Sequence, residues 1–399
     1  MLSRSLRVDT ALLAVVVLAA CSGSDGSTAV ADPTSIAVAT STATTVTAPA
    51  TVAVTDPATT AAPTTIAATT VAPSTTLASP TGDVFPGSEW ATAPFPAGVD
   101  QAAVDAAVDT AFGAPDASAR VRSIVVVEGG RIVYERYHPL DSADTIMDSY
   151  SVAKSFTSSL IGLLVGDGEL DVTDPAPVAL WSDPADPRHA ITTEQLLHMA
   201  SGLDWTEEYS SADSPVLAML SAPDASASVA SRPMEAAPGE KFEYSTGTTA
   251  VLAGIATDLL GGPDTADAYF HDRLLDPLGI TSIQFMRDPA GRWVGGLGAN
   301  QTTRDFARFG LLYLNDGIWD GERILPEGWV DYSHTPSATN AQYGAQWWML
   351  HPDSFEARGL FGQIILVSQV NDLVIAINTT AGGDADSLID TVYPLFAAG

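Results

Sequence analysis

The chain has 399 residues, a formal net charge of −31, six histidines and one cysteine. So large an excess of acidic residues argues against nucleic acid and anionic lipid as partners, and we expect most carboxylates to form a solvated exterior. A single cysteine cannot form a disulfide within the chain.

The first residues resemble a targeting signal. Arg4 and Arg7 precede an apolar run over residues 11–20, which is too short to span a bilayer and is typical of a signal-peptide core. The run ends at Cys21 with small residues after it, a pattern similar to the lipobox of bacterial lipoproteins. We therefore predict a signal peptide over 1–20, lipidation of Cys21, and an extracytoplasmic protein whose only membrane contact is its lipid anchor.

Residues 21–82 have the composition of a tether. They are mostly Thr, Ala, Ser, Pro and Val, with almost no aromatic residues and no regular apolar period. Such a segment buries too little surface to offset the entropy of ordering, and its prolines keep it extended. We predict a disordered linker before a folded domain at 83–399, which is long enough for one mixed domain with an inserted lobe.

Strand patterns occur near both ends of this predicted domain. Residues 121–127 and 131–137 are β-rich runs around Gly129-Gly130, which is typical of a hairpin. Further β-rich runs occur at 346–350, 359–368 and 373–379. The pattern predicts an α/β fold in which an antiparallel β-sheet is built from both ends of the domain.

Helical patterns fill most of the remaining domain. They flank the strand runs at 99–112, 303–314 and 386–396, and short ones separated by Pro, Gly and Ser occupy 192–269. We therefore expect helices against the sheet and an inserted all-helical lobe at about 165–335.

Ser151 and Lys154 give the first chemical signal. They lie three positions apart where an apolar helix begins, so both side chains fall on one face, one turn apart. A lysine can deprotonate a serine only if its pKa is lowered, as burial would do, and a helix N-terminus favours an oxyanion at the serine. The chain has only one other lysine, Lys241, which favours a catalytic Ser-x-x-Lys pair over an exposed helical lysine.

Tyr244 is the best candidate for a third group that passes a proton to the leaving atom. A Pro-Gly turn at 238–239 delivers it to the start of a small-residue helix at 248–260. A purely structural tyrosine is the alternative. Tyr313 and Asn315 fit a Tyr-x-Asn pattern by letters, but they end a periodic helix, so we interpret them as core and turn.

Several separate motifs follow one another along the domain. They are Ser151-Val152-Ala153-Lys154, LLHMASGLDW at 196–205, PGEKFEYS at 238–245 and RDFARFG at 304–310. Together they resemble the β-lactamase-related serine hydrolases, and within them the branch of 6-aminohexanoate-dimer hydrolases and class C-type esterases. The resemblance covers essentially all of 85–399, and it implies an active site in the groove between a sheet domain and a helical lobe.

The resemblance also implies roles for individual residues. By position, Ser151 would be the acylated nucleophile, Lys154 its base and Tyr244 the proton relay. The backbone N–H groups of Ser151 and Leu360 would form the oxyanion hole. A glycine at 359, Gly359, would allow close approach of the backbone to substrate.

The chain departs from the family at the third motif. β-lactamases and penicillin-binding proteins carry Lys-Thr-Gly or His-Thr-Gly on the strand beside the site, and neither occurs here. Its loss removes the usual partner of a penicillin carboxylate, which lowers our expectation of strong β-lactamase activity. Arg358 is a candidate replacement for that cation, and a solvated strand arginine is the alternative.

Further positions are candidates for binding substrate. Thr246 stands where relatives commonly have Asn, and threonine keeps one donor but loses the geometry of the amide. Tyr209 matches a loop tyrosine that lines the pocket in the oligomer-hydrolase branch, and Trp347 and Trp348 stand where that branch also has aromatic residues. Packing is the alternative role for these three aromatic residues.

Motifs for other chemistries are absent from the sequence. There is no Gly-x-Ser-x-Gly elbow, no pair of histidines at zinc-binding spacing and no glycine-rich nucleotide loop. We therefore predict a serine hydrolase without metal or cofactor that acts on a small-molecule ester or amide, with peptidoglycan-derived molecules among the candidates. The alternatives are a peptidoglycan D,D-peptidase or β-lactamase on the same fold, and a surface binding protein without turnover.

Overall fold

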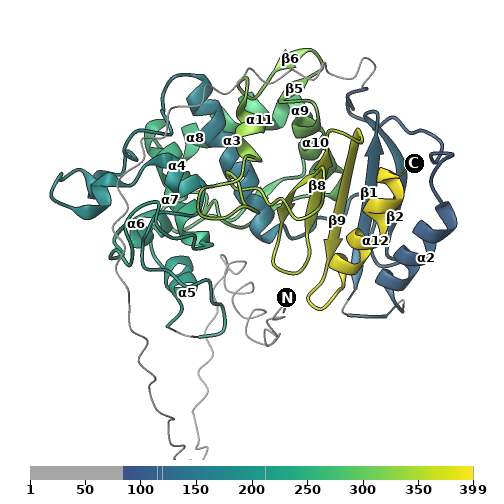
Figure 1. The fold of residues 1–399 in the computed structure, drawn as a ribbon, viewed down its shortest axis with the longest axis horizontal. Helices are drawn as coiled ribbons and strands as arrows, with labels where there is room; N and C mark the ends of the chain where they lie inside the picture. The colour runs from purple at the N-terminus through teal and green to yellow at the C-terminus, as the bar shows by residue number, and fades with distance from the viewer. Residues whose placement is uncertain (1–83, 115, 119, 212, 399) are drawn as a thin grey trace, which may run out of the picture. The chain divides into compact units, whose positions relative to one another are not determined.

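The computed structural model describes residues 84–398 except 115, 119 and 212 (Figure 1). The predicted signal peptide, the lipidation site Cys21 and the predicted tether all lie outside the described residues. Within the described ranges, none of the helices combines the length and the apolar character needed to cross a bilayer.

Five antiparallel strands form the main sheet in the order β2-β1-β9-β8-β7 (Figure 1). Their bounds are β1 Val121–Glu128, β2 Arg131–Tyr137, β7 Phe355–Arg358, β8 Ile364–Ser368 and β9 Leu373–Thr379. The first and last parts of the domain meet at the sheet centre, where Val125 of β1 lies opposite Ala376 of β9. The predicted α/β class, with an antiparallel sheet built from both ends of the domain, is confirmed.

Helices cover both faces of this sheet, which explains why β9 is buried along its whole length. On one face lie α2 (Gln101–Phe112) and α12 (Ala385–Ala397), side by side (Figure 1). On the other face α10 (Thr303–Leu314) packs against β1, β8 and β9. Gly310 permits this close packing, because a Cβ atom there would lie 2.6 Å from a methyl carbon of Val374.

Helix α3 (Ala153–Gly166) connects the sheet half of the domain with the helical half. Almost all of its side chains are buried, and Phe156 stacks on Phe309 of α10 with 3.8 Å between the ring centroids. On its other side α3 contacts α7 (Thr246–Leu259). The apolar run that marked this helix in the sequence is therefore the contact surface for two layers.

Shorter elements complete the described fold. The helices are α4 Thr193–Leu197, α5 Pro215–Leu220, α6 Ala225–Ala230, α8 Pro263–Phe270, α9 Asp276–Leu278 and α11 Trp329–Ser333. The short turns of helix are η2 Ala179–Trp181, η3 Pro187–Ala190 and η4 His271–Leu275. Two small ladders pair β3 Gln284–Phe285 with β4 Ala299–Asn300, and β5 Ile318–Trp319 with β6 Glu322–Arg323.

The helical half matches the predicted lobe only in part. Helices α4 to α8 lie on the far side of α3 from the sheet (Figure 1). Helix α10, although it falls within the predicted lobe boundaries of about 165–335, packs directly on the sheet. The chain therefore leaves the sheet, builds the helical half and returns through α10 before the last three strands.

The structure differs from the predicted strands near residue 350. Residues 346–350 form no strand: Gln346 has a left-handed backbone with φ of 70°, and Trp348 makes only isolated β-bridges, to Tyr343 and Glu356. Residues 359–363 form the turn between β7 and β8, where Gly362 N–H donates to the carbonyl of Gly359 at 3.0 Å. The apolar residues in these stretches serve packing rather than strand pairing.

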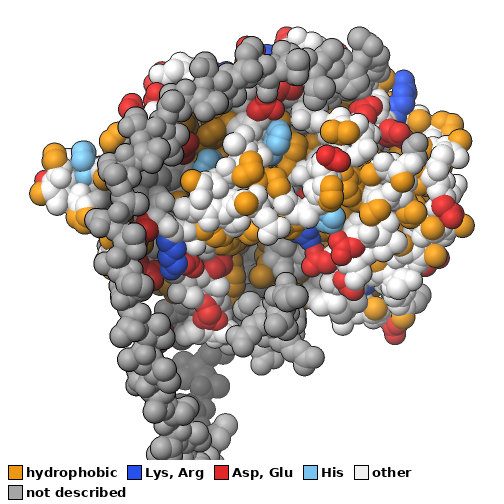
Figure 2. All heavy atoms as spheres, viewed as in Figure 1, with side chains coloured by type: hydrophobic (Ala, Val, Ile, Leu, Met, Phe, Trp, Pro, Cys, Tyr) orange, Lys and Arg blue, Asp and Glu red, His pale blue; other side chains and the backbone are white. Residues whose placement is uncertain are grey.

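Acidic side chains are spread over the face seen in Figure 2, among apolar and uncharged ones. Many of the acidic side chains are paired with arginines, as in Arg273 with Asp167 at 2.5 Å. This distribution fits the expected solvated exterior.

Candidate active site

Ser151 lies in a single helical turn, η1 (Tyr150–Val152), directly before α3. Its side chain is 8% exposed, whereas Lys154 on the first turn of α3 is 1% exposed. The turn is held by Ser149, whose backbone N–H donates to Asn300 Oδ1 at 2.9 Å. The serine thus stands at the edge of the core with the lysine beneath it.

The amine of Lys154 has three polar neighbours. Its Nζ lies 2.9 Å from Ser151 Oγ, 2.9 Å from Thr246 Oγ1 and 2.8 Å from the carbonyl oxygen of Gly296. Burial lowers the pKa of Lys154 to about 8, while the negative charge of Glu207 opposes that shift. About a tenth of the amine is therefore neutral at pH 7 and free to accept a proton.

Tyr244 lies beside this pair, in the segment that leads into α7. Nζ of Lys154 is 4.9 Å from the centroid of the tyrosine ring. Burial raises the pKa of Tyr244 well above its usual value, so the group is a neutral phenol that can donate its proton. The structure therefore brings the three residues predicted for catalysis together.

The end of β7 lies against the turn that carries the serine. A Cβ atom on Gly359 would lie 2.6 Å from the carbonyl oxygen of Ser149, and the rings of Tyr150 and Phe361 meet edge to face at 5.0 Å. The close approach at Gly359 is thus to the chain's own backbone, whereas the sequence predicted an approach to substrate.

The backbone amides in this turn differ in their partners. Gly359 N–H donates to the backbone carbonyl of Gln363 at 2.8 Å. Phe361 N–H donates to the side-chain oxygen of Gln363, Oε1, at 3.3 Å. The Leu360 N–H between them has no acceptor among the described residues. It is the amide to which the family resemblance gave a role in the oxyanion hole.

Glu207 is a residue of this site that the sequence did not single out. Its Oε2 accepts hydrogen bonds from the indole N–H of Trp205 at 2.7 Å and from the backbone N–H of Thr246 at 2.8 Å. Its Oε1 accepts from the hydroxyl of Tyr209 at 2.5 Å and from the Thr246 hydroxyl. Tyr209 and Thr246, both predicted to bind substrate, are therefore joined through Glu207.

The prediction for Trp347 is wrong. Its side chain is 0% exposed and packs in the core against Phe309, Tyr313 and Phe355, so it cannot line a pocket. The neighbouring Trp348 is half-buried and lies 5.4 Å from the ring of Tyr244. Two adjacent tryptophans therefore point in different directions, and the second is the one at the site.

Arg358 is held by carboxylates. Its guanidinium pairs with Glu356 at 2.6 Å and also with Asp386 of α12. Glu356 is fully buried and also contacts His351. An arginine with two acidic partners is poorly placed to receive a substrate carboxylate, which contradicts the binding role expected from the sequence.

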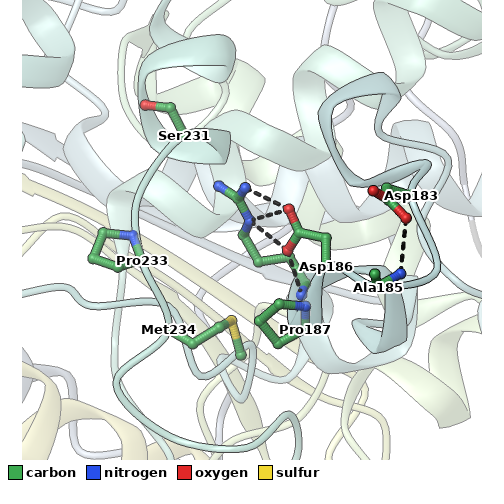
Figure 3. A pocket seen from close by; sticks show the side chains of 8 residues that line it. Asp183, Ala185, Asp186, Pro187, Ser231, Pro233 and Met234 are labelled. Carbon is green, nitrogen blue, oxygen red and sulfur yellow. Dashed lines mark hydrogen bonds and ion pairs between the residues drawn. The ribbon is translucent and has the colours of Figure 1, made fainter.

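A hollow lies on the helical half (Figure 3). It has a volume of about 550 Å³ and is lined by Asp183, Ala185, Asp186, Pro187, Arg188, Ser231, Pro233 and Met234. Its cation is already satisfied: Arg188 pairs with Asp186 at 2.6 Å and donates to the carbonyl of Ala230 at 2.9 Å. The hollow contains none of the residues predicted for catalysis.

The described residues include no group of three or more His, Cys, Asp or Glu side chains that could hold a metal ion.

Residues 105–397 match the family model described as Beta-lactamase. The chain belongs to the beta-lactamase family, as its motifs predicted, and it has the β-lactamase/transpeptidase-like fold. The 6-aminohexanoate-dimer hydrolase of Paenarthrobacter ureafaciens is 23% identical over 285 residues, which cover 63% of this chain and 71% of that protein. Penicillin-binding protein 4 of Amycolatopsis lactamdurans is 28% identical over 218 residues, or 46% of this chain and 55% of that protein.

Solved structures agree with this fold. A Bacillus anthracis protein assigned as a 6-aminohexanoate-dimer hydrolase superposes with a TM-score of 0.63 at 22% identity, covering 78% of this chain and 86% of that one. The hydrolase EstCE1, whose described activity includes promiscuous acyl transfer, superposes with a TM-score of 0.60 at 16% identity, covering 73% and 98%. The family and its relatives identify the chain as a hydrolase of the β-lactamase fold.

Proposed function

We propose that this hydrolase cleaves an ester or amide through an acyl-enzyme on Ser151. The observation that carries the proposal is the 2.9 Å separation between Ser151 Oγ and Lys154 Nζ, with the amine buried and its pKa lowered to about 8. A serine becomes a useful nucleophile when a neighbouring base takes its proton. The distance between the two side chains and the lowered pKa of the Lys154 amine both support this role.

In the first half-reaction, Ser151 Oγ forms a bond to the acyl carbon while its proton passes to Nζ of Lys154. The electron pair of the carbonyl moves onto its oxygen, which the N–H groups of Ser151 and Leu360 stabilise. As the intermediate collapses, the bond to the leaving oxygen or nitrogen breaks. Tyr244 gives that atom its phenolic proton and recovers a proton from the Lys154 ammonium.

In the second half-reaction, water attacks the acyl carbon and loses one proton to the same relay. The bond to Ser151 Oγ then breaks, the oxygen takes the proton back, and the acid leaves. The relay thus ends each cycle in its starting state.

A β-lactamase or D,D-peptidase receives less support from the site. Arg358, the candidate partner for a penicillin carboxylate, is already paired with Glu356 and Asp386. A carboxylate placed there would compete with two acidic side chains. We therefore favour esters and amides that lack an anionic group at this position.

The test compares the unaltered chain with Ser151→Ala on short-chain p-nitrophenyl esters, anilides and a chromogenic β-lactam. We expect ester and anilide turnover that Ser151→Ala lowers by about 10⁴-fold or more. Ser155→Ala is the matched control, since its hydroxyl donates to the carbonyl of Gln346 at 2.8 Å, and it should keep near-normal turnover. Ester turnover that survives Ser151→Ala would refute the acyl-enzyme, and turnover confined to the β-lactam would favour the second candidate.

We also propose that the hydrolase is lipid-anchored outside the cytoplasm through Cys21. The support is the sequence alone, namely the short apolar run that ends in the only cysteine. Metabolic labelling with a radioactive fatty acid should mark the unaltered chain and leave Cys21→Ser unlabelled. Equal labelling of both would overturn the anchor and leave the hydrolase proposal untouched.

A further inference from the structure

The hydrogen bonds around Glu207 have directions that chemistry fixes. Its Oε2 receives two N–H groups, from Trp205 at 2.7 Å and from Thr246 at 2.8 Å, and neither group can accept. An ionised carboxylate has no hydrogen to give. The hydroxyl of Thr246 must therefore direct its own proton to Oε1 of Glu207.

This direction has a consequence for Lys154. With its proton on the Glu207 side, Thr246 Oγ1 can only accept from Nζ, which lies 2.9 Å away. The carbonyl oxygen of Gly296, 2.8 Å from Nζ, can also only accept. A neutral amine has two hydrogens, and these two acceptors use both of them. The remaining direction, toward Ser151 Oγ at 2.9 Å, is left for the nitrogen lone pair.

We propose that Glu207, acting through the hydroxyl of Thr246, is a positioning residue that aims the lone pair of Lys154 at the proton of Ser151. The inference rests on the proposed function and adds the group that orients its base. When Ser151 Oγ bonds to the acyl carbon, its proton moves along this line to Nζ. The ammonium that results keeps both acceptors, and the charge of Glu207 lies one hydroxyl away.

Glu207 has a second, opposing effect on the same amine. Its negative charge raises the pKa of Lys154, against the larger lowering by burial. Neutralising Glu207 would therefore increase the fraction of neutral lysine at a given pH. If charge were its only contribution, neutralisation would speed the reaction below pH 8. If it orients the amine, each neutral lysine would react more slowly.

Glu207→Gln separates these two effects without changing the shape of the side chain. The amide oxygen can still accept from Trp205 and from the Thr246 N–H, while the amide NH₂ now donates to the Thr246 hydroxyl. That hydroxyl is then free to donate to Nζ, so the lone pair of Lys154 is drawn away from Ser151. The substitution reverses the two hydrogen bonds at the Oε1 position, those with the hydroxyls of Thr246 and Tyr209, and leaves the two at Oε2 unchanged.

The experiment measures the rate at which a fluorophosphonate labels Ser151, from about pH 5 to pH 10. For Glu207→Gln we expect the high-pH plateau to fall by about 100-fold. The midpoint of its acid limb should also move to lower pH, because the charge that raised the pKa of Lys154 is gone. The midpoint reports the charge of Glu207 and would also move if the residue only held its loop in place. The plateau reports how fast each neutral lysine reacts, and its coupling to Thr246 tests the orienting role.

Three matched variants complete the design. Thr246→Val removes the connecting hydroxyl, so it should lower the plateau to a similar degree, and adding Glu207→Gln to it should cause little further loss. Thr246→Ser should restore labelling. Glu208→Gln makes the same change one residue along, where the carboxylate accepts from Ser210 and Ser211 of its own loop, and should leave plateau and midpoint unchanged.

A Glu207→Gln plateau equal to or above that of the unaltered chain would overturn the inference. Losses from Glu207→Gln and Thr246→Val that simply multiply would also overturn it, because they would show that the two groups act separately. If Ser151 of the unaltered chain is not labelled at any pH, the proposed function itself fails. The failure of the inference and the failure of the proposed function are thus distinguishable.

Discussion

Two carboxylates in this molecule face cations in different ways. Glu356 on β7 is fully buried and contacts both His351 and Arg358 directly. Glu207 is half-buried and reaches Lys154 through the hydroxyl of Thr246. Hydrogen bonding to Glu356 is the main reason that the pKa of His351 is raised, to about 9. The pKa of Lys154 is lowered to about 8, because burial outweighs the charge of Glu207.

The comparison shows that a carboxylate near a cation can give either a fixed ion cluster, as around Glu356, or an amine that accepts a proton, as at Lys154. Direct contact with a buried carboxylate stabilises the charged form of a cation by more than burial disfavours it. Where a hydroxyl lies between carboxylate and amine, the electrostatic attraction is weaker because it falls with distance. The hydroxyl then orients the amine through its hydrogen bond and does not neutralise its charge. Near Glu356, the raised pKa keeps His351 charged at pH 7, and ion pairs of His351 and Arg358 tie α12 to β7. Lys154, by contrast, can lose its proton.

Lys154→Met has the largest expected effect of the predictions made here, and this effect is a loss of activity. Removing the base should lower kcat/KM for a p-nitrophenyl ester by about 10⁴-fold. The free energy of unfolding in urea should stay the same or rise, because burying the amine carries a desolvation cost that methionine avoids. A variant that keeps activity within tenfold would show that Lys154 is not the base.

Glu356→Gln should lower the stability of the fold, whereas Lys154→Met should mainly lower activity. Loss of the buried anion leaves His351 and Arg358 with only exposed acidic partners, and we expect unfolding in urea to become easier by about 3 kcal/mol. Asp386→Asn is the control: it removes an exposed partner of Arg358 and should change stability by less than about 0.5 kcal/mol. Equal losses from both variants would remove the distinction between the two carboxylates.

The sequence predicted the parts of this site that depend on local pattern. Two β-rich runs around Gly129-Gly130 could pair only as a hairpin, and a serine and lysine one turn apart at the start of an apolar helix had to share a face. Tyr244 could be placed because its segment also resembled a family motif. The short distance between Lys154 and Tyr244 agrees with these predictions.

The parts that failed depend on contacts distant in sequence. Nothing local distinguishes Glu207 from Glu208, and only the fold brings Glu207 to Thr246, 39 residues further along. Trp347 and Trp348 are adjacent, so a pattern of letters cannot say which one faces the core. The pairing of Arg358 with Glu356 follows from their positions two apart on one strand, but the strand itself was predicted to begin after Glu356.

The pH dependence of stability gives the smallest effect and the most direct contrast between the two cations. For His351 the pKa rises from 6.5 to about 9 on folding, so its stabilising contribution is complete below pH 6.5 and is lost as the pH rises to about 9. Relative to His351→Gln, the unaltered chain should lose about 1 kcal/mol of unfolding free energy over that range, a modest value because the side chain is partly exposed to solvent and screened.

Lys154 should show the opposite slope. Its pKa falls from 10.5 to about 8 on folding, so the native state holds fewer protons than the unfolded chain between these values. Stability relative to Lys154→Met should therefore rise from about pH 8 to pH 10.5. Urea unfolding of the three proteins across this range measures both slopes. If stability changed with pH in the same direction for both residues, our explanation would be wrong. Direct contact of His351 with Glu356, and separation of Lys154 from Glu207 by one hydroxyl, would then not account for the difference between the two cations.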